Sequence, residues 1–125
     1  MRLLLDTHIY LWVLGDDPKL SESARALICN AETVFVSGAS IWEAAIKASL
    51  GKLDVDVDQL VSAIPESGFV ELPVRAVHAA KVRTLPDLHH DPFDRLLIAQ
   101  AILEPLWLVT SDKHLAGYSE LVKAV

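Results

Sequence analysis

The sequence predicts an α/β fold in which helices cover both faces of a mainly parallel sheet. Four short apolar segments, at residues 3–5, 33–36, 69–72 and 106–109, have the length and the bounding residues of buried strands. Longer segments with apolar residues at helical spacing separate them. Strands that alternate with helices are typical of parallel sheets, because each parallel connection has to cross over the sheet.

The first half of the chain supplies two of these strands. Asp6 follows the first strand and is a candidate N-cap for a helix over THIYLWVL. Ser21 is a candidate cap for a second helix, SESARALICNA, which leads to the β-branched and aromatic strand at 33–36. A third helix is predicted over SGASIWEAAIKASLGKL and is expected to end near Gly51.

The second half supplies the other two strands. The segment DVDQLVSAIPESG predicts a helix that Asp56 or Asp58 caps and that Pro65 and Gly68 end. After the strand at 69–72, the segments VRAVHAAKVRTLP and DPFDRLLIAQA predict two further helices. The last strand then precedes a short helix in SDKHLAGY, and the whole chain, residues 1–125, is expected to form a single domain.

Composition and charge limit the class of protein. The longest apolar stretches are far shorter than the roughly 18 to 20 residues of a membrane span, so we expect no membrane segment. The start, MRLLLD, has too short an apolar run for a signal peptide, and the lone Cys29 cannot form an internal disulfide, which favours the cytoplasm. A net charge of −6 is atypical of a general nucleic-acid coat, yet it is compatible with an enzyme that has a local acidic site.

The chain is also unusually apolar for its size. Hydrophobic residues make up 52% of it, and its mean hydropathy is +0.34. We therefore expect another chain to cover part of the surface, with Trp12 and Trp42 as candidate anchors, and we predict a homo-oligomer.

Four acidic residues fall where an α/β fold binds its ligands. Asp6 and Asp112 come just after predicted strands, and the carboxyl ends of parallel strands form the usual ligand site of such sheets. Glu43 and Asp94 are predicted to lie near the starts of two helices, where the helix dipole favours negative charge. The four acids are therefore candidates for one shared site.

Each of these acids also has a purely structural interpretation. Asp6 and Asp112 are able to cap the helices that follow them. Glu43 forms a capping-box pattern with Ser40, and it is also spaced to pair with Lys47 four residues later. Both interpretations stay open at this point.

The segment HHDPFDRLLIAQA separates the roles of two aspartates. Asp91 precedes Pro92 and fits an N-cap, whereas Asp94 lies one turn later on the same side as Leu97 and Ile98, which we expect to face inward. Carboxylates buried together are disfavoured unless a cation joins them, and a hard divalent ion such as Mg²⁺ or Mn²⁺ meets that need. The predicted chemistry is metal-assisted displacement at phosphorus on an anionic substrate.

Four segments, LLLDTHIYLW, SIWEAAIK, HHDPFDRLLIAQA and LVTSDKHL, resemble the PIN-domain ribonucleases, and most closely the VapC toxins of toxin–antitoxin pairs. They occur in the family's order and span nearly the whole chain. The resemblance implies a three-layer α/β/α sandwich with a short parallel sheet, and Mg²⁺- or Mn²⁺-dependent endonucleolytic cleavage of RNA. It also implies a homodimer and inhibition by a cognate VapB-like antitoxin.

The same resemblance assigns roles within an acidic pocket. Asp6 and Asp94 would be the principal metal ligands, Asp112 would bind the metal or position a water, and Glu43 would coordinate or act as a base through a water. The hydroxyl groups of Thr7 and Ser111 are weaker candidates, which would either bond to metal-bound water or simply cap helices. His8 departs from the family pattern, because many relatives carry Asn there.

Basic and histidine residues are harder to assign from the sequence. Arg95, Lys47 and Lys113 are candidate contacts to RNA phosphates, and Arg95 has a surface ion pair as its alternative. His89 and His90 are adjacent and cannot both face one site from a regular element, so we expect them to be exposed.

Two other classes of function compete with a nuclease. A receiver-like or phosphohydrolase domain also puts aspartates at strand ends, but Asp6-Thr7-His8 lacks the paired acids or the D-x-D motif that such proteins carry after the first strand. A non-catalytic protein-binding module would use its carboxylates only as caps, and it predicts that Mg²⁺ and Mn²⁺ do not stabilise the chain.

Overall fold

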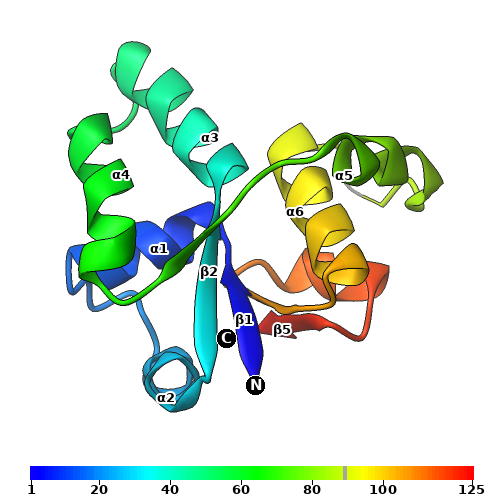
Figure 1. Ribbon diagram of the computed structural model, residues 1–125, viewed down its shortest axis with the longest axis horizontal. Coiled ribbons are helices and arrows are strands. Elements are labelled where there is room, and N and C mark those ends of the chain that lie inside the picture. Colours follow the sequence, from blue (N-terminus) through cyan, green and yellow to red (C-terminus); the bar gives the residue numbers. More distant parts are fainter. Residues whose placement is uncertain (89) are drawn as a thin grey trace.

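A five-stranded parallel sheet forms the centre of the computed structural model, which describes residues 1–88 and 90–125 (Figure 1). The strand order is β3-β2-β1-β4-β5, and each neighbouring pair is parallel. The strands are β1 (Arg2–Leu5), β2 (Thr33–Ser37), β3 (Val70–Leu72), β4 (Trp107–Thr110) and β5 (Val122–Ala124). The predicted α/β class with a parallel sheet is confirmed, and β5 is a strand that the sequence patterns did not indicate.

Across the residues that the structure describes, six α-helices and two 3₁₀ helices connect these strands. They are α1 (Thr7–Leu14), α2 (Glu22–Asn30), α3 (Gly38–Ser49), α4 (Val57–Glu66), α5 (Ala76–Lys81), η1 (Val82–Thr84), α6 (Pro92–Leu103) and η2 (Lys113–Tyr118). Within the described residues, no helix has both the length and the apolar character needed to cross a membrane.

Two hydrophobic cores lie on opposite faces of the sheet. Alternate residues of β1 divide between them, because Leu3 and Leu5 point to one face and Leu4 to the other. The first core contains buried residues of α1, α2, α3 and α4, and the second contains those of α6 and η2. Figure 1 shows the same division, with α1, α2 and α4 to the left of β1 and β2, and α5 and α6 to the right. The molecule is therefore a three-layer sandwich.

The strand order reverses direction at β1, and this reversal positions the site. The chain passes from β1 outward to β2 and β3, then returns to pair β4 with the other side of β1. Leu5 is in register with both Val36 and Val109, so the next residues, Asp6, Ser37 and Thr110, come level at the carboxyl edge of the sheet. Open α/β sheets bind ligands at such a reversal, because the connections there diverge to opposite faces.

The interpretation of Ser40 and Glu43 as a capping box is wrong. Helix α3 begins directly after β2, and its N-cap is Ser37, whose hydroxyl oxygen accepts a hydrogen bond from the backbone N–H of Ala39 at 3.0 Å. Ser40 and Glu43 are therefore buried inside the helix, not at its start. The reason is that β2 passes into α3 without a loop, so the cap is the last residue of the strand itself.

The other helix boundaries are close to those expected. Asp6, Ser21 and Asp56 cap the helices that follow them through side-chain acceptors. Pro65 is an exception, because it lies inside the last turn of α4 and does not end the helix. The chain turns instead at Gly68, whose φ of 77° is a conformation that favours glycine.

Candidate active site

Asp6 lies at the carboxyl end of the central strand and is only 5% exposed. Its Oδ1 accepts a hydrogen bond from the backbone N–H of Ile9 at 2.9 Å, and its Oδ2 accepts one from the hydroxyl of Thr110 at 2.5 Å. Burial raises the pKa of Asp6 above its ordinary value, and the hydrogen bonds from Thr110 and Ile9 oppose that rise. The carboxylate is thus fixed in direction by two donors of its own chain.

Glu43 reaches the same region from α3 and is 4% exposed. It accepts a hydrogen bond from Lys47, with 2.7 Å between Oε2 and Nζ, which is the ion pair that the spacing of four residues predicted. The hydrogen bond with Glu43 raises the pKa of Lys47, burial opposes this rise, and the charges of Asp91 and Asp94 add to it. Lys47 therefore supplies positive charge to the acidic residues of both helices.

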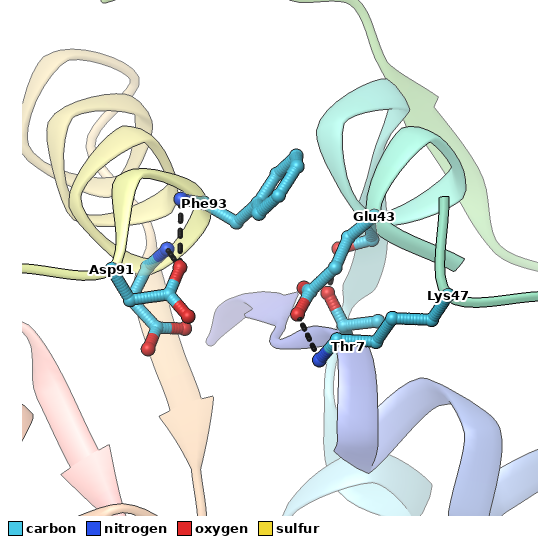
Figure 2. Close-up of polar contacts among 7 residues, drawn as sticks. Thr7, Glu43, Lys47, Asp91 and Phe93 are labelled. Carbon is cyan, nitrogen blue, oxygen red and sulfur yellow. Dashed lines mark hydrogen bonds and ion pairs between the residues drawn. The ribbon is translucent and has the colours of Figure 1, made fainter. Parts of the chain in front are cut away.

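Asp94 lies in the first turn of α6, and the other candidate acids converge on it. The pKa of Asp94 is raised to about 7, first by burial and then by the negative charges of four other acids, in decreasing order of effect Asp91, Asp6, Glu43 and Asp112. Figure 2 shows Asp91 and Phe93 at the start of α6 on one side of the site, with Glu43 and Lys47 of α3 on the other. Five carboxylates from distant parts of the chain thus share one electrostatic environment.

Thr110, which was not among the predicted site residues, connects two of the predicted acids. Its fully buried hydroxyl donates to Asp6 and accepts a hydrogen bond from the backbone N–H of Asp112 at 3.0 Å. A threonine at the end of a strand, two residues before a candidate ligand, was the available signal. Asp112 in turn caps η2 by accepting from the backbone N–H of His114 at 2.9 Å.

Thr7 and Ser111, the candidates for bonding metal-bound water, occupy different surroundings. Thr7 is buried and donates to the hydroxyl of Ser40 at 3.0 Å, which links the start of α1 to α3 (Figure 2). Ser111 is exposed. His8 is also exposed, and its charge lowers the pKa of Asp6.

A divalent cation would suit the chemistry of this donor set. All five acids and Thr110 offer oxygen atoms, the ligands that Mg²⁺ and Mn²⁺ prefer, and the raised pKa of Asp94 reflects an excess of negative charge. Nevertheless, among residues 1–88 and 90–125 no three His, Cys, Asp or Glu side chains are already arranged as a metal-ligand group. The residues fit a hard cation in charge and in the type of donor atom.

Arg95 has hydrogen bonds that give it a structural role. Its guanidinium donates to the carbonyl oxygens of Pro86 at 2.9 Å and Val82 at 3.2 Å, and to the hydroxyl of Tyr118 at 3.2 Å. It therefore joins η1 and η2 to α6. Lys113 is exposed at the start of η2. Contacts of Arg95, Lys47 and Lys113 with RNA phosphates stay predictions.

His90 is exposed, as expected, whereas the prediction for His89 lies outside the described residues. Trp42 is 61% exposed and Trp12 is half-buried against the first core.

Asp91 is the N-cap of α6, and its loss is expected to lower stability. Its Oδ1 accepts hydrogen bonds from the backbone N–H groups of Phe93 at 2.8 Å and Asp94 at 3.2 Å. We expect Asp91→Ala to have a free energy of unfolding about 0.5–2 kcal/mol below that of Asp91→Asn, because asparagine caps as well as aspartate does. Both variants remove the same negative charge beside Asp94, so urea unfolding of the pair isolates the cap. Equal midpoints would show that the cap contributes nothing.

The chain is similar to known proteins over nearly its whole length. A family model described as the PIN domain matches residues 3–121. The chain is 28% identical over 122 residues to Ribonuclease VapC22 of Mycobacterium tuberculosis, a match that covers 93% of this chain and 91% of that protein.

Solved structures share the fold. One is VapBC2 from Rickettsia felis bound to a DNA fragment from its promoter, with a TM-score of 0.69 and 20% identity over 99% of this chain and 98% of that chain. Another is a toxin–antitoxin complex from Klebsiella pneumoniae, with a TM-score of 0.67 and 17% identity over 98% of this chain and 96% of that chain. The family match across residues 3–121, together with this likeness of fold, shows that the chain belongs to the PIN-domain family.

Proposed function

We propose that this protein is a metal-dependent endoribonuclease of the VapC toxin type. The observation that carries the proposal is the convergence of Asp6, Glu43, Asp91 and Asp112 on Asp94, whose pKa they and burial raise to about 7. Such an excess of buried negative charge is typical of a site built to hold a cation. Membership of the PIN-domain family and the similarity to a protein named as a ribonuclease support the same conclusion.

Within this proposal, Asp6, Asp94 and Asp112 hold Mg²⁺ or Mn²⁺. When bound, the cation supplies Lewis-acid activation of water and compensates the charge of the phosphodiester. Thr110 orients Asp6 through Oδ2 and keeps Asp112 nearby through its backbone N–H. These two hydrogen bonds hold residues from β1 and the end of β4 in a fixed relation, which reduces the reorganisation that binding requires.

Glu43 and Lys47 have complementary roles in the proposed reaction. In the present structure Lys47 neutralises Glu43 across 2.7 Å. Once the site holds a cation, Lys47 is free to contact the RNA phosphate, and Glu43 Oε2 is free to accept a proton from the attacking water. The ion pair thus places the positive charge of Lys47 directly beside the acidic site.

The proposed partners are an antitoxin and a second copy of the chain. The Klebsiella pneumoniae structure with the same fold is described as a toxin–antitoxin complex, which supports an antitoxin partner for this chain as well. Exposed apolar side chains, including Val77 and Leu88, offer surface for such partners. A cytoplasmic location is consistent with such a role.

The direct test is RNA cleavage by the purified protein with Mn²⁺, with Mg²⁺, and with EDTA. We expect cleavage of total cellular RNA at discrete positions with either metal, complete loss in EDTA, and recovery when metal is added in excess. Cleavage that continues in EDTA would contradict a metal-dependent mechanism. A folded protein that cuts no RNA and whose melting temperature ignores both metals would favour the non-catalytic binding module instead.

A further inference from the structure

An apolar cavity of about 250 Å³ lies between α3, α5 and α6. It is lined by Trp42, Ala79, Val82, Pro92, Phe93 and Leu96. All six lining residues are uncharged, and two of them are aromatic. The rings of Trp42 and Phe93 meet edge to face, with 5.1 Å between centroids and an interplanar angle of 75°.

This cavity adjoins the acidic site through two pairs of sequence neighbours. Trp42 directly precedes Glu43 on α3, and Phe93 directly precedes Asp94 on α6. The backbone N–H of Phe93 is itself held by Asp91. Figure 2 shows the ring of Phe93 extending from the start of α6 towards α3, beside the carboxylates. When the phosphate of a substrate lies at these acids, the group next to that phosphate is therefore within reach of the aromatic wall of the cavity.

The large exposed surface of Trp42 indicates that this side chain contacts a ligand. Its side chain is 61% exposed, although an indole gains more from burial than most side chains do. Single-stranded nucleic acids are bound by stacking bases on such exposed aromatic rings, while the phosphates are held by other groups. Val82 on the wall of the cavity is flanked by Lys81 and Arg83, which place positive charge on the same α5–η1 segment.

A larger cavity elsewhere in the described part of the chain is less suited to a nucleotide. It lies between α1 and α4 and measures about 680 Å³, but Asp54, Asp56 and Glu66 contribute to its lining. These carboxylates would repel a phosphate backbone. The cavity at Trp42, by contrast, combines an aromatic wall with proximity to the acidic site.

We propose that this cavity binds one base of the RNA substrate next to the cleaved phosphate, with the base stacked on Trp42. The assignment rests on the proposed function, and it makes Trp42 a specificity-determining residue of that site. The volume is below the roughly 300–1,000 Å³ of sites for drug-sized ligands, which suits a single base and excludes a duplex. Recognition by stacking favours unpaired RNA, because a paired base cannot enter the cavity.

The test measures RNA binding without cleavage, in an Asp94→Asn background. The probes are a fluorescein-labelled single-stranded oligoribonucleotide of mixed sequence and a matched oligomer that lacks its bases. We expect a further Trp42→Ala change to weaken binding of the first probe roughly 5- to 150-fold, and to leave binding of the abasic probe unchanged. Trp42→Phe should retain most of the affinity, because it keeps an aromatic face.

Leu50→Ala is the matched control, since Leu50 is 62% exposed just after α3 and lies outside the cavity. Thermal melts verify that each variant is folded. Equal loss on both probes, no loss on either, or no RNA binding by the Asp94→Asn parent would overturn the proposal. Trp42→Ala that changes self-association or antitoxin binding and leaves RNA affinity unaltered would assign the cavity to a protein partner instead.

The outcome is separable from that of the proposed function. If the protein does not cleave RNA but its RNA binding depends on the bases and on Trp42, the catalytic assignment is removed and the base-binding role of the cavity is kept. Metal-dependent cleavage with RNA binding indifferent to Trp42 would do the reverse.

Discussion

Replacing Asp94 with Asn is expected to reduce RNA cleavage by at least about a hundredfold while leaving the fold intact, because even partners of metal ligands contribute about 10- to 100-fold. Asp94 is the residue on which the charges of four other acids act. The amide has nearly the same shape, and the hydrogen bond from the Asp94 backbone to Asp91 does not depend on the side chain that is changed. The lost activity therefore reports the lost charge.

The measurement is single-turnover cleavage of RNA at saturating Mn²⁺, compared with wild type. Asp58→Asn is a matched control, because Asp58 is also an acidic residue in the first turn of a helix but is exposed and lies on α4, away from the site. We expect wild-type rates from this control. An Asp94→Asn protein that cleaves RNA as fast as the wild type would remove Asp94 from the proposed machinery.

Local sequence determined much of the fold. Buried strands were predictable where apolar runs are continuous, as in Leu3–Leu5, and helix starts were predictable where a short polar side chain precedes the helix, as at Ser21. Strand β5 was not, because Val122–Ala124 is short and contains a lysine in its centre. Its pairing with β4 depends on a neighbouring strand that is already in place. Such a strand is defined by its tertiary context.

In the candidate site, too, local sequence predicted some contacts and not others. The ion pair of Glu43 and Lys47 was predictable because four residues on a helix bring two side chains together. The hydrogen bond from Thr110 to Asp6 was not, since it joins residues at opposite ends of the chain whose contact depends on the register of β1 and β4. Convergence of the acids on Asp94 likewise depends on how α3 and α6 pack, which no local pattern encodes.

The stability of the metal-free protein is expected to fall as the pH rises from about 4 to about 7. Asp94 has a pKa of about 7 in the folded protein and an ordinary value of 3.8, so between these limits the folded state keeps a proton that the unfolded state has released. Tighter proton binding by the folded state lowers the free energy of unfolding as pH increases, and the full loss is present above pH 7. Asp6, whose pKa burial also raises, acts in the same direction.

Comparison with Asp94→Asn isolates this effect, because the remaining titratable groups are common to both proteins. The full difference in pKa would correspond to about 4 kcal/mol, but partial exposure and screening reduce it, and we expect Asp94→Asn to gain about 1–2 kcal/mol over wild type between pH 4 and 8. Denaturant unfolding in EDTA across that range measures the difference. Parallel plots of stability against pH for the two proteins would show that folding does not raise the pKa of Asp94.

Mn²⁺ should reverse the same loss, because a divalent cation competes with the proton for the carboxylate of Asp94. Stabilisation by a ligand at about 100 times its dissociation constant amounts to about 2.7 kcal/mol. We therefore expect Mn²⁺ to raise the melting temperature of the wild type strongly at pH 8, weakly at pH 5, and much less in Asp94→Asn at either pH. The Asp58→Asn protein should respond like the wild type. A Mn²⁺ effect that is the same at both pH values, or that survives in Asp94→Asn, would place the ion elsewhere on the molecule and separate metal binding from the charge gathered around α6.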